Sequence, residues 1–526
     1  MILEEVFAVQ QIGFPILSAL IFLPLLWAIL LSFIRDGDLA RKTALAGALL
    51  ELVLALIMVF SFIPGTSDLQ FVERAEWMPN LGVGYHVGVD GISVLFIPLT
   101  AFLTVMVMLL SWSTVRFLTK PYLIAVLGFE AATIGVFASL DLLLFFVFWE
   151  LMLVPSYFLL KLWGSGPQRQ YAGMKYVMYM LVGSAPMLVG IVLLGLNYYD
   201  VTGEYSFDFP TLLTAPASQE LQTLIFFLLA FGFAVKGPLF PFHTWLPTVF
   251  SEGPVGMSIF LVGLKMGIYG FIRFAIPLAP EAAREWFWLM AVLGVIAVIY
   301  GALIALVQPN LRRLLAFASV SHVGLATLGM FSLSVQGLQG GLLMLINMGI
   351  ASAGLFFLAG FLYARTGSWE LSAFGGMARH VPLLATFFLI IGLAGIGMPG
   401  TSGFPGEFLI LLGAFRAHWA LAAVAVLGVV LSAAYFLTYY ERAFFGPVTR
   451  DAVRRSQDLR PRETVIAATL VVAIFWIGLF PAPLLNITSG SVQALVERVE
   501  QGPAPQLAQH GYQVQEPTES WVAMHE

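Results

Sequence analysis

Five ionisable side chains lie inside stretches of sequence that are otherwise apolar enough to cross a lipid bilayer. They are Glu150, Lys236, Lys265, His322 and Glu407. A charged side chain at the centre of a bilayer costs about 2.5–3.5 kcal/mol on insertion scales, so such a residue is by default a functional candidate. Two carboxyl groups, two amines and one imidazole suit a relay that passes protons better than a pocket that binds a metabolite.

The five residues suggest an order of proton transfer. Burial disfavours the charged form of any side chain and a nearby opposite charge favours it, so a Glu–Lys pair can act as a switch. We expect Glu150 to modulate Lys236, and Lys265 to pass the proton on. An imidazole titrates in the physiological range, so His322 would carry the proton towards Glu407, the exit group. Water at breaks in the helices would connect groups that are too far apart to touch.

Other polar residues near the apolar segments have weaker claims to a role in the relay. Glu130, His243 and Asn347 are candidate accessory residues. Glu51 and Glu130 are lone acids in ordinary apolar segments, and each is equally well explained as a protonated, hydrogen-bonded structural group. Asp141 stands where an apolar segment begins, and we expect it to cap a helix N-terminus.

Two of the apolar segments, 221–246 and 381–412, are long and interrupted by glycine and proline. Lys236 is followed by Gly-Pro-Leu-Phe-Pro, and Glu407 closes the run Gly-Met-Pro-Gly-Thr-Ser-Gly-Phe-Pro-Gly-Glu. Proline breaks helices because it lacks a backbone N–H. Irregular backbone at membrane depth is tolerated only where protein or a water-filled cavity surrounds it. The sequence therefore predicts a cation and a carboxyl group beside two hydrated helix breaks.

These markers recur at a nearly constant spacing. Glu407 follows Lys236 by 171 residues, and His322 follows Glu150 by 172 residues. The spacing favours two five-helix repeats, 121–278 and 286–440, over chance. Because each repeat has an odd number of spans, the second would be inverted, as in repeat-built transporters. A three-helix segment, 1–120, would precede them, and a basic loop, a last helix and a polar tail, 441–526, would follow.

The composition of the chain indicates a polytopic helical membrane protein. Of 526 residues, 60% are hydrophobic and 10% are charged, whereas soluble proteins have roughly 25% charged residues. This excludes a soluble enzyme, a disordered chain and a nucleic-acid-binding protein, so no nucleic-acid partner is expected. The absence of cysteine excludes disulfides, thiolate catalysis and Fe–S ligation. We predict an all-α fold with about fourteen transmembrane helices, each of about 20 mostly apolar residues.

Loop charges predict the orientation of these helices. Odd-numbered loops hold 18 Lys and Arg residues, and even-numbered loops hold 4. Because cytoplasmic loops are enriched in these residues, odd-numbered loops should face the cytoplasm and both termini the opposite side. The N-terminus lacks the basic region of a cleavable signal peptide. We expect the chain to lie in the inner (cytoplasmic) membrane of a prokaryote or in an equivalent energy-transducing membrane.

Five sequence motifs resemble one known family. They are Trp149-Glu150-Leu-Met-Leu-Val-Pro155, Lys236-Gly-Pro…Pro241-Phe-His243-Thr-Trp245-Leu-Pro247, Ser319-Val-Ser-His322-Val-Gly324, Ala353-Gly-Leu-Phe356 and Gly397-Met-Pro-Gly400…Gly406-Glu407-Phe408. Across about 90–446 the chain is similar to the antiporter-like subunit M (chain 4) of respiratory complex I, the proton-translocating NADH–quinone oxidoreductase.

The resemblance implies a fold, a function and a set of partners. The implied fold has fourteen transmembrane helices, two inverted five-helix repeats and broken helices 7 and 12. The implied function is proton translocation coupled to electron transfer in other subunits, with the five ionisable residues above at the family's relay positions. No redox cofactor is implied in this subunit; FMN, Fe–S clusters, NADH and quinone would bind to partner subunits. The implied partners are the other membrane-arm subunits, the lipid bilayer and protons.

The chain departs from the family pattern at two histidine positions. Phe250 stands where the family usually has a histidine after Trp-Leu-Pro-Asp-Ala, and Met348 stands about where the family has one in helix 11. Since methionine cannot carry a proton, a link from His322 to Glu407 would need Asn347, a hydroxyl group or water.

These departures suggest a divergent member and leave alternatives open. One is a subunit of a multi-component cation/proton antiporter or of a membrane-bound hydrogenase. Another is a membrane subunit of an inorganic-carbon uptake complex. A purely structural spacer is the last, and the costly charges retained within apolar segments argue against it.

Overall fold

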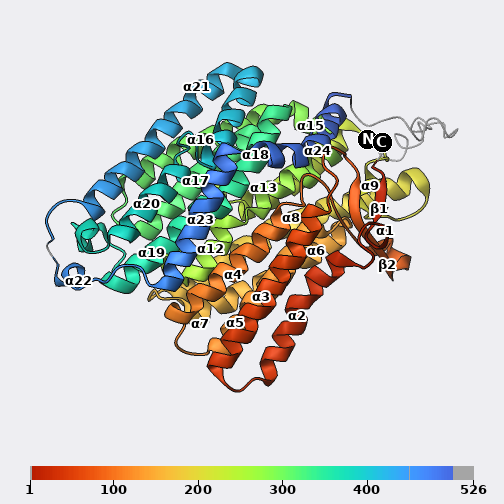
Figure 1. Cartoon of the computed structure of the whole chain (residues 1–526). Coiled ribbons are helices and arrows are strands. Elements are labelled where there is room, and N and C mark those ends of the chain that lie inside the picture. Colours follow the sequence, from red (N-terminus) through yellow and green to blue (C-terminus); the bar gives the residue numbers. More distant parts are fainter. Residues whose placement is uncertain (1–2, 449, 502–526) are drawn as a thin grey trace.

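The computed structural model describes residues 3–448 and 450–501 of the chain. Its helices form one bundle in which most run side by side (Figure 1). In the described residues, twelve helices are long and apolar enough to cross a membrane, and two shorter apolar helices, Phe96–Trp112 and Pro382–Gly395, accompany them. The predicted all-α, multi-pass fold is therefore confirmed, while the count of fourteen spans stays a prediction.

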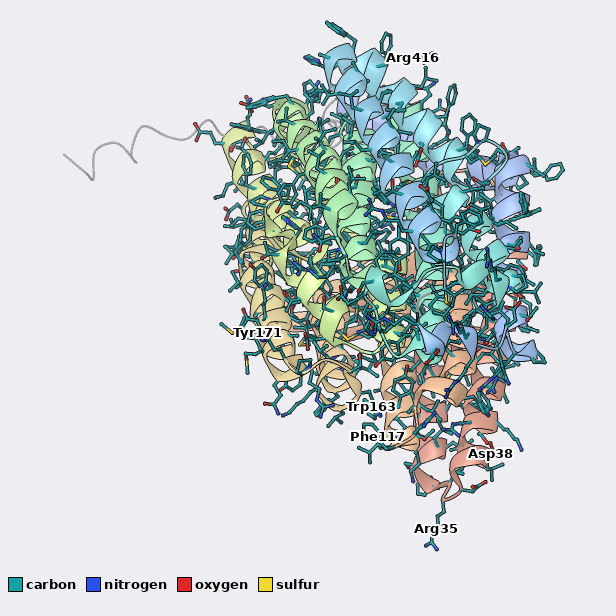
Figure 2. All side chains as sticks on the ribbon, turned by 90° about the vertical axis from the view of Figure 1, so that its left-hand side faces the viewer. Arg35, Asp38, Phe117, Trp163, Tyr171 and Arg416 are labelled. Carbon is teal, nitrogen blue, oxygen red and sulfur yellow. The ribbon has the colours of Figure 1, made fainter. Side chains whose placement is uncertain are left out.

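Inside a bilayer each apolar segment must satisfy its own backbone hydrogen bonds, which a helix does. The apolar helices follow one another along the chain, and some of the shorter ones join into a single span. Their bounds are α2 (Ile16–Phe33), α3 (Gly37–Phe60), α4 (Phe96–Thr114), α5 (Thr119–Ala138), α6 (Leu142–Leu151), α7 (Leu153–Trp163), α8 (Arg169–Thr202), α10 (Gln219–Lys236), α12 (Val255–Gly263), α16 (Phe287–Val307), α17 (Leu311–Met330), α18 (Val335–Asn347), α19 (Ala353–Thr366), α20 (Pro382–Gly395), α21 (Gly403–Phe444) and α23 (Pro461–Leu479). Figure 2 places Arg35, at the α2–α3 turn, and Arg416, in α21, at opposite ends of the bundle.

Both predicted helix breaks are present. α10 ends at Lys236, and the chain resumes regular structure in a 3₁₀ turn, η2 (Phe242–Thr244), and in α11 (Trp245–Glu252). α20 ends at Gly395, and the linker to α21 contains Gly397 and Gly400, both at positive φ. Glycine adopts positive φ without the clash that a Cβ would bring, which explains the glycines at this break.

A third break was not predicted. α12 ends at Gly263, and α13 (Met266–Gly270) begins only after Leu264 and Lys265, whose backbone is not helical. A π-helical turn, η3 (Phe271–Ala275), follows directly, and a second one, η4 (Met348–Ser352), joins α18 to α19. π-turns inside helices occur frequently at functional sites.

A small sheet and a further helix lie at one end of the bundle, on the side of β1 and α24 in Figure 1. The strands are β1 (Glu5–Phe7), β2 (Leu69–Met78) and β3 (Val83–Val89), in the order β1-β2-β3. β2 and β3 form an antiparallel hairpin, and β1 pairs with β2 in parallel. α24 (Ala482–Gln501) binds the bundle through a hydrogen bond from the Arg498 Nε to the Pro277 carbonyl, 2.6 Å long. The predicted polar tail beyond Gln501 lies outside the described residues.

Charged side chains fasten the sheet to the bundle. His86 in β3 hydrogen-bonds the carboxylate of Asp208, which caps α9 (Phe209–Leu212), and Arg74 in β2 pairs with Glu5. Burial favours the neutral form of Asp208, but the hydrogen bond and the charge of His86 outweigh it and hold its pKa below the ordinary value of 3.8. Asp208 therefore remains an ionised anchor for the hairpin at neutral pH.

Candidate functional site

Lys236 stands at the first helix break, and its ammonium group is held by Trp149. The Nζ donates a hydrogen bond of 2.8 Å to the Trp149 carbonyl and lies 3.7 Å from the centroid of the indole ring. Phe145 and Phe233 pack against the indole, at 5.4 and 5.6 Å between ring centroids. A ring face attracts a cation and cannot take a proton from it. The structure therefore provides a fixed resting place for the charged lysine.

Glu150 follows Trp149 in α6 but does not form an ion pair with Lys236 in the described structure. It is half-buried, its Oε1 has no hydrogen-bond partner among the described residues, and its charge acts on Lys236 electrostatically. Pro155 in the first turn of α7 loosens the helix here, since it offers no N–H to the turn before it. Glu150 thus affects Lys236 electrostatically without forming an ion pair with it in the described structure.

Lys265 lies at the third break. Its Nζ donates to the Leu261 carbonyl at 2.8 Å, one turn earlier, and the side chain is 2% exposed. Gly267, just after it, packs so closely on Gly237 that a Cβ at Gly267 would overlap the backbone there. The breaks that carry Lys236 and Lys265 are therefore in direct contact, which the sequence did not reveal.

His322 lies in α17 within electrostatic range of Lys265. Its ring lies near the Gly395 carbonyl, yet neither ring nitrogen makes a hydrogen bond within the described chain. Ser319, one turn earlier in α17, also has an unpartnered hydroxyl. Buried polar groups are normally hydrogen-bonded, so an unpaired imidazole here needs an explanation such as an unseen water.

Glu407 and Asn347 both contact the second break. The Glu407 carboxyl group lies directly against Gly397, where any Cβ would collide with it. Asn347 at the end of α18 accepts a hydrogen bond of 2.7 Å from Ser402 and points its amide at the Ala394 carbonyl, 3.5 Å away. Asn347 thus stabilises the break through its hydrogen bonds, and Gly397 leaves room for the Glu407 carboxyl group.

The other candidate accessory residues lie away from the five. Glu51 in α3 lies within electrostatic range of Glu130 in α5, and none of their carboxyl oxygens has a hydrogen-bond partner in the described structure. His243 sits among aromatic rings, 5.1 Å from the Tyr300 ring. In the part of the chain that the structure describes, no hydrogen bond or ion pair joins Glu130 or His243 to a relay residue. Asp141 caps α6 by accepting from two backbone N–H groups, as predicted.

Sequence reasoning missed a buried ion pair. The Nη1 of Arg273, in the π-turn η3, lies 2.6 Å from the Asp90 Oδ2, and both side chains are 2% exposed. The signal existed, because Arg273 stands inside an apolar segment and meets the criterion that singled out the lysines. Its partner could not be found, because 183 residues separate the two.

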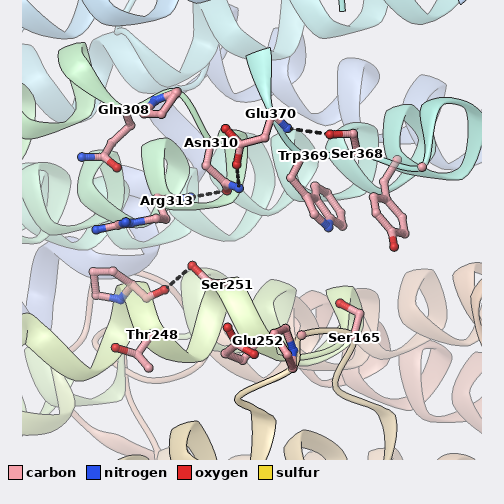
Figure 3. Close-up of a pocket in the computed structure, with 16 residues that line it drawn as sticks. Ser165, Thr248, Ser251, Glu252, Gln308, Asn310, Arg313, Ser368, Trp369 and Glu370 are labelled. Carbon is pink, nitrogen blue, oxygen red and sulfur yellow. Dashed lines mark hydrogen bonds between the residues drawn. The ribbon is translucent and has the colours of Figure 1, made fainter. Parts of the chain in front are cut away.

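A cavity lies elsewhere, at the seam between the predicted repeats. It measures about 690 Å³, and Figure 3 shows Asn310, Glu370 and Arg313 on one side of it and Thr248 and Glu252 on the other. Beside it, the buried Arg312 reaches across the seam to the Ser165 hydroxyl and the Ser251 carbonyl, at 3.1 and 3.0 Å. None of the five ionisable candidates lines this cavity.

The described residues show no cluster of metal-ligating side chains at this site. Within the described residues, no group of three or more His, Cys, Asp or Glu side chains is arranged to hold a metal ion. What the site offers is single ionisable groups: Lys236, Lys265 and Glu407 lie at helix breaks, and Glu150 and His322 lie within helices. Such groups can bind and release protons.

Comparisons with known proteins show the family of this chain. A family model described as NADH:quinone oxidoreductase/Mrp antiporter, TM, matches residues 139–432. The NADH-quinone oxidoreductase subunit M of Rickettsia prowazekii (strain Madrid E) is 38% identical over 491 residues, which cover 92% of this chain and 99% of the relative.

Two solved structures are similar along nearly the whole chain. A chain of respiratory complex I from Thermus thermophilus with bound NADH is 36% identical with a TM-score of 0.82, covering 91% of this chain and 99% of that one. A chain of the Mrp complex from Dietzia sp. DQ12-45-1b has a TM-score of 0.80 at 24% identity, covering 92% and 99%, which shows a likeness of fold. The chain therefore belongs to the family of NADH:quinone oxidoreductase/Mrp antiporter membrane subunits.

Proposed function

We propose that this chain is the antiporter-like subunit M of a proton-translocating NADH–quinone oxidoreductase, and that it moves protons through five residues. The relay runs through Glu150, Lys236, Lys265, His322 and Glu407. The observation that carries the proposal is the placement of two buried lysines at two helix breaks that touch each other. The hydrogen bonds of both lysines go to backbone carbonyls, in the described chain, and a carbonyl can hold an ammonium group without taking its proton.

The proposed mechanism is a set of charge-controlled proton transfers. When Glu150 is charged and near Lys236, it favours the protonated amine; when it is neutralised or moves away, Lys236 can release the proton. Lys265 receives it across the contact between the two breaks. His322 takes it into the second half of the chain, and Glu407 releases it beside the glycine-rich break.

The subunit has the partners that this function requires. NADH, FMN, Fe–S clusters and quinone bind to other subunits, and this chain carries no cofactor of its own. Its segments are 1–120, two inverted repeats at 121–278 and 286–440, and 441–526. It lies in the cytoplasmic membrane of a prokaryote, or an equivalent energy-transducing membrane, beside other membrane-arm subunits, with both termini on the non-cytoplasmic side.

The second candidate is a subunit of a multi-component cation/proton antiporter, which the fold of the Mrp complex chain supports. The identity of 36% to the complex I chain, against 24% to the Mrp chain, favours the first candidate. Mass spectrometry of the purified assembly separates the candidates. NADH- and quinone-binding subunits support the first, and an assembly without redox subunits supports the second.

The relay is tested by replacing the lysines in the purified complex reconstituted in vesicles. We expect Lys236→Met and Lys265→Met to abolish proton translocation through this subunit, because methionine fills similar space and carries no proton. Lys175→Met is the matched control: Lys175 is half-buried on α8 and donates to the Thr244 carbonyl at 2.9 Å. Full translocation by the Lys236→Met complex would refute the proposed relay.

A further inference from the structure

A small cavity lies beside His322 in the second half of the chain. It measures about 20 Å³ and is walled by α17, the η4–α19 turn, α20 and α21, with His322, Ser352, Gly395 and Tyr435 on its surface. A site of roughly 10–15 Å³ holds one water molecule if two to four polar groups line it. The cavity therefore has room for a single water.

The cavity offers that water hydrogen-bond partners. Both ring nitrogens of His322 are unpartnered within the described chain. The Tyr435 side chain is 4% exposed, and its hydroxyl makes no hydrogen bond with a described residue. A tyrosine hydroxyl donates one hydrogen bond and accepts another, so it can bond a water on one side and a carboxylate on the other.

The Tyr435 hydroxyl lies within electrostatic range of the Glu407 carboxyl group. Both residues are in α21, which has a non-helical residue at His418 between them. Arg416, two residues before that point, lies at the end of the bundle (Figure 2). Glu407 and Tyr435 thus stand on either side of a kink in one helix.

One neighbouring polar side chain, that of Asn347, is already engaged. Asn347 accepts a hydrogen bond from Ser402 and does not line the cavity. Met348, in the π-turn η4, is fully buried and has no group that exchanges protons. The gap between His322 and Glu407 is therefore left to the cavity and to the hydroxyl groups on its surface, of which Tyr435 is the one within electrostatic range of Glu407.

We propose that the hydroxyl of Tyr435 and one water in this cavity carry protons from His322 to Glu407. This inference rests on the proposed proton relay. An N–H bond of protonated His322 breaks as the water takes the proton, and the water passes one of its own protons to the Tyr435 oxygen. The O–H proton of Tyr435 moves to Glu407. Water and tyrosine each gain and lose one proton, and no electrons move.

Two substitutions test the two parts of this link. Tyr435→Phe removes the hydroxyl and keeps the ring. Gly395→Ala places a methyl group at the cavity, where its closest neighbour would be the Leu355 Cδ1 at an ordinary 3.7 Å, so the methyl displaces the water without a clash.

Each variant has a matched control. Tyr440→Phe removes a hydroxyl from the same helix that donates to the Ala385 carbonyl at 3.2 Å, away from the cavity. Gly128→Ala adds a methyl group in α5, where nothing lies within 4 Å of the new atom. The amount of assembled complex is measured for all four variants.

Proton translocation by the reconstituted complex gives the answer. We expect Tyr435→Phe and Gly395→Ala to lower its rate at least about tenfold. A positioned proton-transfer group typically accelerates a reaction roughly 10²–10⁴-fold. The expected loss is smaller because water partly replaces the lost link. The solvent isotope effect of Tyr435→Phe should rise, because proton transfer becomes slower; a merely structural role would leave it unchanged. The inference is overturned if either variant stays within about twofold of its control.

Lys236→Met in the same assay separates this inference from the relay itself. If that complex translocates protons normally, the proposed function fails and this inference fails with it. If Lys236→Met is inactive while Tyr435→Phe matches Tyr440→Phe, the relay stands and the tyrosine link alone is overturned.

Discussion

Asp90 and Arg273 form a buried ion pair, and we predict that replacing each of them destabilises the protein by a different amount. The Asp90 Oδ1 also accepts backbone N–H groups of Ile92 and Ser93, at 3.0 and 3.2 Å. Arg273 has no such support: its Nε and Nη2 have no hydrogen-bond partner in the described chain, and its guanidinium lies 4.9 Å from the Phe209 ring centroid. Loss of the carboxylate therefore leaves a buried cation beside the aromatic ring of Phe209.

The magnitudes follow from these partners. Removing one member of a buried ion pair costs about 3–5 kcal/mol, and we expect the full cost for Asp90→Asn. Arg273→Met leaves a carboxylate that keeps two backbone hydrogen bonds, each worth about 1.5–3 kcal/mol to a charged group, so we expect a smaller cost of about 1–3 kcal/mol. The double variant, which carries neither charge, should fall within about 2 kcal/mol of the native protein.

The absence of cysteine from the chain supplies the assay. Ala101 in α4 is fully buried, so Ala101→Cys introduces one thiol that reacts only when this part of the bundle opens. Labelling of that peptide in the purified complex, measured by mass spectrometry, should be about 10²–10⁴-fold faster with Asp90→Asn, since 1.4 kcal/mol is tenfold. Equal effects of the two single variants, or a double variant as unstable as their sum, would refute the reasoning.

Three other contacts give predictions of their own. Trp149→Leu should lower proton translocation while Trp149→Phe keeps most of it, because the ring face holds the Lys236 ammonium at a worth of about 0.5–2 kcal/mol; equal rates for the two variants would contradict this. Asp208 has a lowered pKa, so its ionised form stabilises the protein above pH 3.8, and this contribution is lost as the pH falls further. The difference in melting temperature between the native and Asp208→Asn complexes should therefore be present at pH 7 and shrink below about pH 4. A difference that grows below about pH 4 would be evidence against this reasoning. Glu51→Gln combined with Glu130→Gln should leave the yield of assembled complex unchanged, because the amides keep the shape and remove two unpaired acids; a large drop in yield would show that a charge is needed.

Local sequence features predict much of this fold. Apolar length predicts the helices, because a bilayer accepts few other structures for an isolated segment. Gly237, Pro238 and Pro241 predict the break after Lys236, because proline cannot continue a helix and glycine does not favour one. Asp141 predicts a helix start, since its side chain can accept the free N–H groups there.

Contacts between distant segments set the limits of prediction. Lys265 lies at a break that no proline announces, and Gly267 packing on Gly237 is visible only in three dimensions. The sheet at one end depends on pairing between β1 and β2, whose Glu5 and Leu69 are far apart in sequence. The resting place of Lys236 at Trp149 was missed, because a pattern of charges draws attention to Glu150 and not to a neighbouring carbonyl and ring.

Glu407 is the residue at which the relay is tested most directly. The measurement is the number of protons translocated per electron by reconstituted complexes that carry Glu407→Gln, with Glu497→Gln on the exposed face of α24 as the control. The amide keeps the size of the side chain and cannot carry a proton, so the relay predicts a lower ratio for Glu407→Gln and an unchanged ratio for the control. An unchanged ratio and rate with Glu407→Gln would contradict the claim that protons leave this subunit through Glu407.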